Sequence, residues 1–298
     1  MHFTTITSSE KGPREEQQDA AGAVSREDRM LAVVCDGAGG HRGGSQASKL
    51  AVQTACEAFE KAGGNFVNPK AALLELCRRA NEAILSLGET PKMAPKSTLA
   101  ALYLDGEKAH MVHVGDSRIY RLRSGKMIAR TRDHTMVQIL LEQGEVREDE
   151  MGTHPDQGRL LRALGTDEEL RPTYGVVELT GNDGFLLCSD GFWERTSVAE
   201  IEAFFQSGPE AQKLDVLVSR TIERNGPKGD NVTALAVSRE GEGSRPNSTV
   251  VWKVIIGTVI VAMLLGAAVF LWLFPLWYGA ANDDLVVPSI AEPSIHPQ

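Results

Sequence analysis

Runs of apolar residues that end in an acidic residue beside glycine recur along the first 240 residues. Residues 31–35 are apolar without interruption and end at Asp36-Gly37, which is typical of a short strand buried on both faces. Glycines are frequent over the next eight positions, so the backbone can turn sharply there and approach a ligand closely. Taken alone, this pattern fits either a metal or phosphate site or an ordinary helix cap formed by Asp36.

The same combination of apolar run, carboxylate and glycine returns at Gly115-Asp116, Asp190-Gly191 and Gly229-Asp230. Carboxylate oxygens repeated at strand ends suit a hard divalent cation such as Mg²⁺ or Mn²⁺, which prefers oxygen ligands. The repetition favours a shared metal site over four unrelated helix caps.

The remaining periodicity predicts a mixture of helices and antiparallel strands. Apolar residues at helical spacing predict helices over residues 47–59, 69–87, 136–141 and 209–224, with another capped near Ser197. Strands are expected at residues 97–104, 109–114 and 118–122, joined as a meander by turns at Gly106 and Gly115. Polar residues at about 136–170 predict a surface flap between sheet elements.

Composition narrows the classes of partner. The chain has 298 residues, and its hydrophobic fraction of 42% and charged fraction of 24% are ordinary for a globular protein. A net charge of −9 argues against a nucleic-acid partner, which would need a basic face. The four cysteines form no C-x-x-C pair, which indicates buried thiols in a reducing compartment rather than a zinc site.

One segment differs from the rest in being apolar on every face. Residues 254–274 are 21 residues without a charge, and as a helix they would span about 31 Å, close to the thickness of a bilayer core. With Trp252 as an aromatic anchor, we expect a transmembrane helix over residues 252–274. A linker at 241–251 precedes it, and a short Pro-rich extracytoplasmic tail at 275–298 follows.

Charges on the two sides of this segment predict its orientation. Arg245 and Lys253 precede it, whereas Asp283 and Asp284 follow it. Because basic residues stay on the cytoplasmic side, we expect the domain at residues 1–240 to lie in the cytoplasm.

Five motifs in order resemble those of the metal-dependent serine/threonine protein phosphatases of type 2C. The resemblance covers about residues 1–240, and the form Asp-Gly-x-Gly-Gly-His is most similar to bacterial members. The motifs are Arg14-x-x-Gln17-Gln18-Asp19, Asp36-Gly37-Ala38-Gly39-Gly40-His41, Gly115-Asp116-Ser117-Arg118, Ser189-Asp190-Gly191 and Gly229-Asp230-Asn231-Val232-Thr233.

This resemblance implies an α+β fold, a four-layer αββα sandwich of two mainly antiparallel sheets flanked by helices, to which the C-terminal transmembrane helix is added. It implies two Mn²⁺ or Mg²⁺ ions, and a third is an open possibility. The metal ligands it implies are Asp36, the Gly37 carbonyl, Asp190 and Asp230 for the first two ions, Asp19 through bound water, and Asp116 with Asp190 for the third.

The resemblance also assigns residues to the phosphate. It implies that Arg14 binds the substrate phosphate, that Thr98 lies near the metal cluster, and that His41 is the candidate general acid. Gln17 and Gln18 depart from the Asn and Glu common at these places, which predicts altered metal affinity. Ala38 stands where animal members carry a histidine, so the acid role of His41 remains open, with His134 as the next candidate.

Physical chemistry supports these assignments independently. Two metal ions about 3.5–4 Å apart can lower the pKa of a shared water and stabilise an in-line displacement at phosphorus. No protein nucleophile is then needed, in agreement with the absence of a Cys-x5-Arg loop from the sequence. Arginine at position 14 can bind phosphate oxygens in a bidentate manner that lysine cannot match.

Two functions from different classes follow. The first is a single-pass protein of the bacterial cytoplasmic membrane that hydrolyses phosphoserine and phosphothreonine in phosphorylated proteins and opposes a Ser/Thr kinase. The alternative is a catalytically silent scaffold of the same fold that binds phosphoproteins; the full set of aspartates speaks against it. A calcium-binding adhesion module fails because its domain would have to lie outside the cell.

Overall fold

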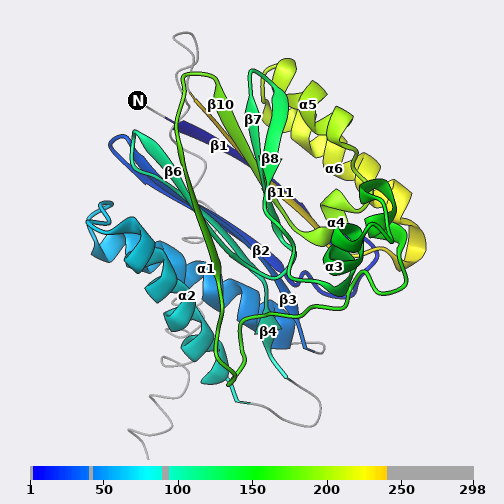
Figure 1. Cartoon of the computed structure of the whole chain (residues 1–298), viewed down its shortest axis with the longest axis horizontal. Helices are drawn as coiled ribbons and strands as arrows, with labels where there is room; N and C mark the ends of the chain where they lie inside the picture. The colour runs from blue at the N-terminus through cyan, green and yellow to red at the C-terminus, as the bar shows by residue number, and fades with distance from the viewer. Residues whose placement is uncertain (1–2, 40–42, 89–93, 240–298) are drawn as a thin grey trace, which may run out of the picture. The chain divides into compact units, whose positions relative to one another are not determined.

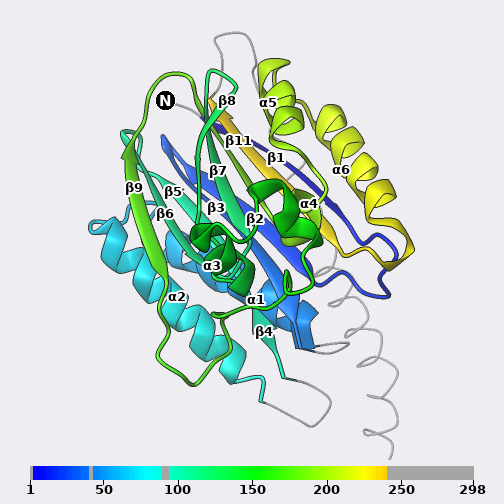
Figure 2. The same ribbon diagram turned by 45° about the vertical axis from the view of Figure 1, so that its right-hand side comes forward.

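Two antiparallel β-sheets pack face to face in the part of the chain that the computed structural model describes, residues 3–39, 43–88 and 94–239 (Figure 1). Helices cover the outer face of each sheet (Figure 2). The α+β prediction of two antiparallel sheets between helices is therefore confirmed.

The predicted linker, membrane segment and tail at 241–298 lie outside the described residues, and so does His41. Within the described ranges, no helix is both long and apolar enough to cross a bilayer.

The first sheet has the strand order β1-β11-β10-β7-β8, and every neighbouring pair is antiparallel. Its strands are β1 (Phe3–Glu10), β11 (Val232–Arg239), β10 (Asp183–Cys188), β7 (Arg118–Arg123) and β8 (Lys126–Arg130). The second sheet has the order β2-β3-β5-β6-β9, with the two-residue strand β4 paired to the end of β3. Its strands are β2 (Asp19–Arg26), β3 (Arg29–Ala38), β4 (Lys96–Ser97), β5 (Leu99–Leu104), β6 (Lys108–Val114) and β9 (Thr173–Glu178).

Strand β3 explains why its sequence is apolar without alternation. Successive side chains of a strand point to opposite faces. Leu31, Val33 and Cys35 therefore pack under the helices, whereas Ala32 and Val34 pack between the two sheets. Both faces are covered, so every position from 31 to 35 is fully buried.

The helices cover the two outer faces separately. Helices α1 (Gly43–Lys61) and α2 (Pro69–Leu85) pack on the second sheet, and α3 (Met136–Gln143), α4 (Asp190–Trp193), α5 (Val198–Gln206) and α6 (Ala211–Asn225) pack on the first. Short 3₁₀ turns, η1 (Glu148–Thr153) and η2 (Gly226–Lys228), complete the elements. Asn68 caps α2, since its Oδ1 accepts the Ala71 N–H at 3.2 Å.

The predicted meander is wrong at its third strand. Strands β5 and β6 form a hairpin, but β7 pairs with β10 and β8 in the other sheet. The chain therefore passes from one sheet to the other at Gly115. This residue has a φ of 98°, and a Cβ there would lie only 2.6 Å from the Thr98 methyl, so glycine is required. A periodicity of two identifies a strand but does not say which sheet it joins, so this crossover resembled a hairpin turn.

The predicted flap, residues 136–170, is attached to the domain at several points. Ser97 and Leu164 exchange backbone hydrogen bonds of 3.2 and 2.7 Å. The Asn81 side chain accepts the N–H groups of Gly165 and Thr166 at 2.8 and 3.1 Å. These contacts hold the segment whose residues 157, 158 and 160–163 line a cleft together with Asp36 and Asp190.

Candidate active site

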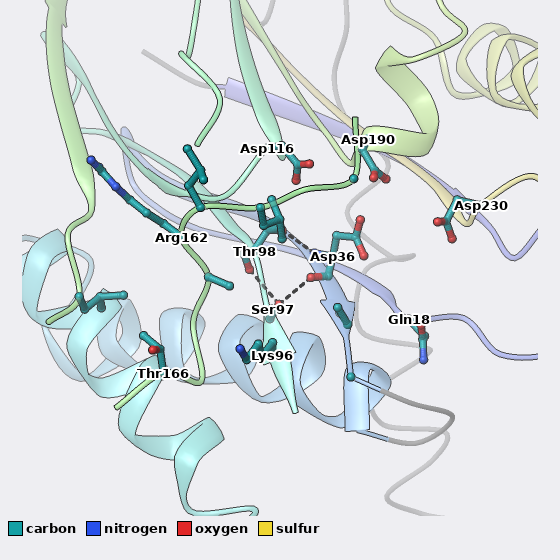
Figure 3. Close-up of a pocket in the computed structure, with 18 of the residues that line it drawn as sticks. Gln18, Asp36, Lys96, Ser97, Thr98, Asp116, Arg162, Thr166, Asp190 and Asp230 are labelled. Atoms are coloured by element: carbon teal, nitrogen blue, oxygen red, sulfur yellow. Dashed lines mark hydrogen bonds between the residues drawn. The ribbon is translucent and has the colours of Figure 1, made fainter. Parts of the chain in front are cut away.

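Five aspartates from both sheets meet at one end of the sandwich, and we call them the carboxylate cluster. Asp19 begins β2 directly opposite Asp36 on β3. The other three, Asp116, Asp190 and Asp230, follow β6, follow β10 and precede β11. Antiparallel pairing brings the end of one strand beside the start of the next, so these positions share one edge. Figure 3 shows four of them around a cleft of about 580 Å³.

Glycines allow the loop after Asp36 to approach helix α1. A Cβ on Gly37 would lie 2.0 Å from the Gly44 carbonyl oxygen, and one on Gly39 would lie 1.8 Å from the Ala94 carbonyl oxygen. No other residue fits at these positions without moving the backbone. The expected close approach of the backbone is therefore present at both.

Hydroxyl groups fix the backbone of Asp36. Its N–H donates to Thr98 Oγ1 at 2.8 Å, and its carbonyl accepts the Thr98 N–H at 2.8 Å. Ser97 Oγ donates to the same carbonyl at 3.1 Å (Figure 3). Thr98 thus lies beside the cluster, where it contacts the Asp36 backbone.

Ionisation of the carboxylate cluster is energetically unfavourable. Burial raises the pKa of Asp36, Asp116 and Asp190 above the ordinary value, and neighbouring carboxylates raise each further. Burial also raises the pKa of Asp19 to about 7, although the hydrogen bond from Ser189 opposes the rise. A cation among these groups would relieve both the desolvation and the repulsion.

The donor set fits a divalent cation. All its side-chain donors are carboxylate oxygens, the ligands that Mg²⁺ and Mn²⁺ prefer. Asp19 Oδ1 is buried and has no hydrogen-bond partner among the described residues. Within those residues, no three His, Cys, Asp or Glu side chains are already gathered around one point. The fit therefore rests on donor chemistry and on this orphaned oxygen.

Arg14 reaches the cleft from the loop after β1. Its Nη2 atom lies 2.7 Å from Asp230 Oδ2, and its Nε donates to the Gly229 carbonyl at 3.1 Å. Asn231 holds this loop, because its Nδ2 donates to the carbonyls of Lys11 and Glu16. The guanidinium remains about half exposed at the rim of the cleft, where a substrate can reach it.

His134 does not suit the role of a general acid. Its Nδ1 accepts the Gly115 N–H at 3.2 Å, and its Nε2 contacts Thr173 Oγ1 and Arg162 Nη1. Burial and the nearby His113 lower the pKa of His134 to about 3. A neutral imidazole is a poor general acid at neutral pH, so this environment disfavours His134 as the proton donor.

Trp193 and Arg118 support Asp116, and the sequence reading assigned neither to that task. The Trp193 indole N–H donates to the Asp116 carbonyl at 3.0 Å, and the Arg118 guanidinium stacks 3.4 Å from the Trp193 ring centre. Arg118 also binds both carboxylate oxygens of Asp133 in the interior. Arg118 opens the predicted strand at residues 118–122 directly after Asp116-Ser117, and this position was the available signal, because a buried cation requires a partner.

Fold and site together define a class of protein. A cleft lined by four aspartates whose oxygens suit divalent cations, with an arginine at its rim, is typical of enzymes that hydrolyse phosphate esters with the help of metal ions.

Comparison with known proteins identifies the family. The Protein phosphatase 2C family model matches residues 13–214, so the chain belongs to this family. The serine/threonine phosphatase stp of Listeria innocua is 31% identical over 232 residues, which are 76% of this chain and 91% of that protein. PstP of Mycobacterium tuberculosis is 34% identical over 213 residues, which are 70% of this chain but 40% of PstP.

Solved structures agree. The crystal structure of PstP/Ppp of Mycobacterium tuberculosis matches 80% of this chain and 99% of its own, with 32% identity and a TM-score of 0.70. A PstP catalytic domain in complex with two manganese ions matches 79% of this chain and 97% of its own, with 30% identity and a TM-score of 0.68. The chain is thus an enzyme, a metal-dependent protein-serine/threonine phosphatase.

Proposed function

We propose that this chain is a membrane-tethered phosphatase that hydrolyses phosphoserine and phosphothreonine in proteins phosphorylated by a Ser/Thr kinase. The observation that carries the catalytic part is the meeting of the carboxylate cluster with Arg14 in one cleft. The family relationship supports the same chemistry.

In this proposal the residues of the cleft have different roles. Asp36, the Gly37 carbonyl, Asp190 and Asp230 hold two divalent cations, and Asp116 contributes with Asp190 to a third. When bound, such cations lower the pKa of water and neutralise charge on the reacting phosphate. Asp19, the member of the cluster that lies in the interior, orients water, and its burial keeps bulk solvent away from it.

Arg14 orients the substrate phosphate. Its guanidinium offers several N–H donors in a fixed plane, which match two phosphate oxygens at once. The pairing with Asp230 keeps that plane at the rim of the cleft. His41, which lies outside the described residues, is proposed to protonate the departing serine or threonine oxygen.

The membrane tether is proposed from the sequence of residues 252–274. The course of β11 is compatible with it. This strand starts beside Asp230 and ends at Arg239, opposite Phe3, so the last described residue lies at the end of the sandwich away from the cleft. Basic residues before the segment favour a domain in the cytoplasm, where it would meet phosphorylated proteins.

A phosphate-release assay tests the catalytic proposal. The full-length protein should release phosphate from a phosphoserine peptide with Mn²⁺ and lose this activity in excess chelator. Asp190→Asn should reduce the activity at least about 100-fold, because it removes a charged ligand that two cation sites share. An Asp190→Asn enzyme as active as the wild type would exclude the proposed metal site. No observation favours the silent scaffold.

A further inference from the structure

Asp19, a buried member of the carboxylate cluster, lies on a closed ring of side-chain and backbone hydrogen bonds. The ring runs through Asp19, Ser189, Thr233, Ser9 and Gln17 and joins strands β1, β2 and β11 to the end of β10. We propose that Ser189 is a positioning residue that fixes the Asp19 carboxylate for cation binding, with Gln17 fixing its backbone. This inference rests on the proposed place of Asp19 in the cation site.

The hydrogen bonds of Ser189 give its hydroxyl a single orientation. Ser189 is fully buried, and its Oγ accepts the backbone N–H of Thr233 at 3.1 Å. A hydroxyl has one proton to donate, and that proton is directed to Asp19 Oδ2 at 2.7 Å. The Thr233 backbone thus sets the direction in which Ser189 donates.

The result is an asymmetric carboxylate. Oδ2 of Asp19 is held by Ser189, whereas Oδ1 is buried without a hydrogen-bond partner in the described part of the chain. A buried unpaired carboxylate oxygen is costly, so a ligand that satisfies it gains that free energy. One oxygen is therefore fixed to the scaffold and the other is left for a cation or its water.

The rest of the ring fixes the backbone of Asp19. Its N–H donates to Gln17 Oε1 at 3.2 Å, and Gln17 Nε2 donates to Ser9 Oγ at 2.9 Å. Ser9 Oγ lies 2.8 Å from Thr233 Oγ1, which closes the ring. Gln17 serves both partners because its amide offers an acceptor at Oε1 and donors at Nε2.

Calorimetric titration of the full-length protein with MnCl₂ tests the inference without relying on turnover. Ser189→Ala should weaken Mn²⁺ binding about tenfold or more, the usual effect of losing a partner that orients a metal ligand. Ser189→Thr keeps the hydroxyl and should restore most of the affinity. Thr221→Val is the matched control, because it removes a buried hydroxyl that pairs with Thr196 at 2.6 Å instead of with a carboxylate.

A double-mutant cycle with Asp19→Asn separates the possible outcomes. If Ser189 acts through Asp19, adding Ser189→Ala to Asp19→Asn should cause little further loss. Wild-type affinity in Ser189→Ala, beside a weakened Asp19→Asn, would overturn the role of Ser189 and leave the proposed site intact. Wild-type affinity in Asp19→Asn would instead remove Asp19 from the cation site. An equal loss in Thr221→Val would also overturn the inference, since the effect would then be general.

Gln17→Leu provides a second test that does not disturb the buried interior. Gln17 is only partly buried, so its replacement carries less risk to folding than a change at Ser189. We expect Mn²⁺ binding to weaken several-fold, with an unchanged melting temperature in chelator. Unchanged Mn²⁺ affinity in Gln17→Leu would overturn the ring as a positioning device.

Discussion

Arg14 Nη2 lies 2.7 Å from Asp230 Oδ2, so the proposed phosphate ligand and a proposed cation ligand are paired with each other. The pair is partly exposed, and such a pair contributes little to stability. The pair matters because Arg14 and a cation would compete for the Asp230 carboxylate. A cation bound to Asp230 would weaken the hold of that carboxylate on Arg14 and leave the guanidinium available to a phosphate.

Arg14→Ala should raise KM about tenfold for both a phosphoserine peptide and nitrophenyl phosphate. Arg14 is proposed to bind the phosphate, which the two substrates share, so the identity of the leaving group should not matter. Mn²⁺ affinity should not fall, since the cation would no longer compete with an arginine. Steady-state kinetics and calorimetry measure the two effects. Arg14→Lys keeps the charge but loses the planar fork, so it should recover only part of the loss in KM. A loss of Mn²⁺ affinity in Arg14→Ala would assign the residue to the support of the cation site instead.

Asp19 should make the metal-free enzyme less stable as the pH rises. Burial, with smaller contributions from Asp190 and Asp230, raises the pKa of Asp19 from the ordinary 3.8 to about 7 in the folded state. The folded state then binds more protons than the unfolded state, so this group's stabilisation is lost as the pH rises from about 4 to about 7. Denaturation in chelator across this range measures the trend.

Mn²⁺ should reverse that trend, because a bound cation favours the charged carboxylates. Asp19→Asn removes the titrating group and should therefore remove this contribution to the metal-free pH dependence. If the wild type and Asp19→Asn change in stability equally between about pH 4 and about pH 7 in chelator, the proposed burial of uncompensated charge at Asp19 is contradicted.

The sequence predicted the positions that combine two strong local signals. Asp36, Asp116, Asp190 and Asp230 each stand beside glycine at the end of an apolar run, and all four line the cleft. Glycine marks where the backbone must turn or approach closely, and an apolar run marks where a strand is buried. These properties are local, so they can be read without knowing the fold.

Contacts between distant segments could not be predicted in this way. Ser189 and Thr233 are ordinary residues in their own segments, and only the pairing of β10 with β11 brings them together beneath Asp19. Strand 118–122 was placed in the wrong sheet for the same reason, since pairing between distant strands leaves no mark on either strand alone.

The membrane proposal predicts opposite results for two reporter fusions. Basic residues before residue 254 and acidic residues after residue 274 favour a cytoplasmic N-terminal domain. A reporter that works only in the cytoplasm should be active when fused before residue 245, and one that works only outside should be active after residue 285. The reverse pattern would separate the phosphatase domain from cytoplasmic kinases and overturn the proposed location of the domain.

The last prediction concerns His41, whose importance should depend on the group that leaves phosphorus. Serine departs as a strongly basic alkoxide that needs a proton, whereas nitrophenolate is a weak base that does not. His41→Ala should therefore lower turnover of a phosphoserine peptide by about 100-fold and affect nitrophenyl phosphate much less. Arg14→Ala is the comparison, because its effect should be the same for both substrates. Equal slowing of the two substrates in His41→Ala would show that the residue supports the site without donating a proton. Burial and the nearby His113 lower the pKa of His134 to about 3, which makes that histidine a poor substitute donor at neutral pH.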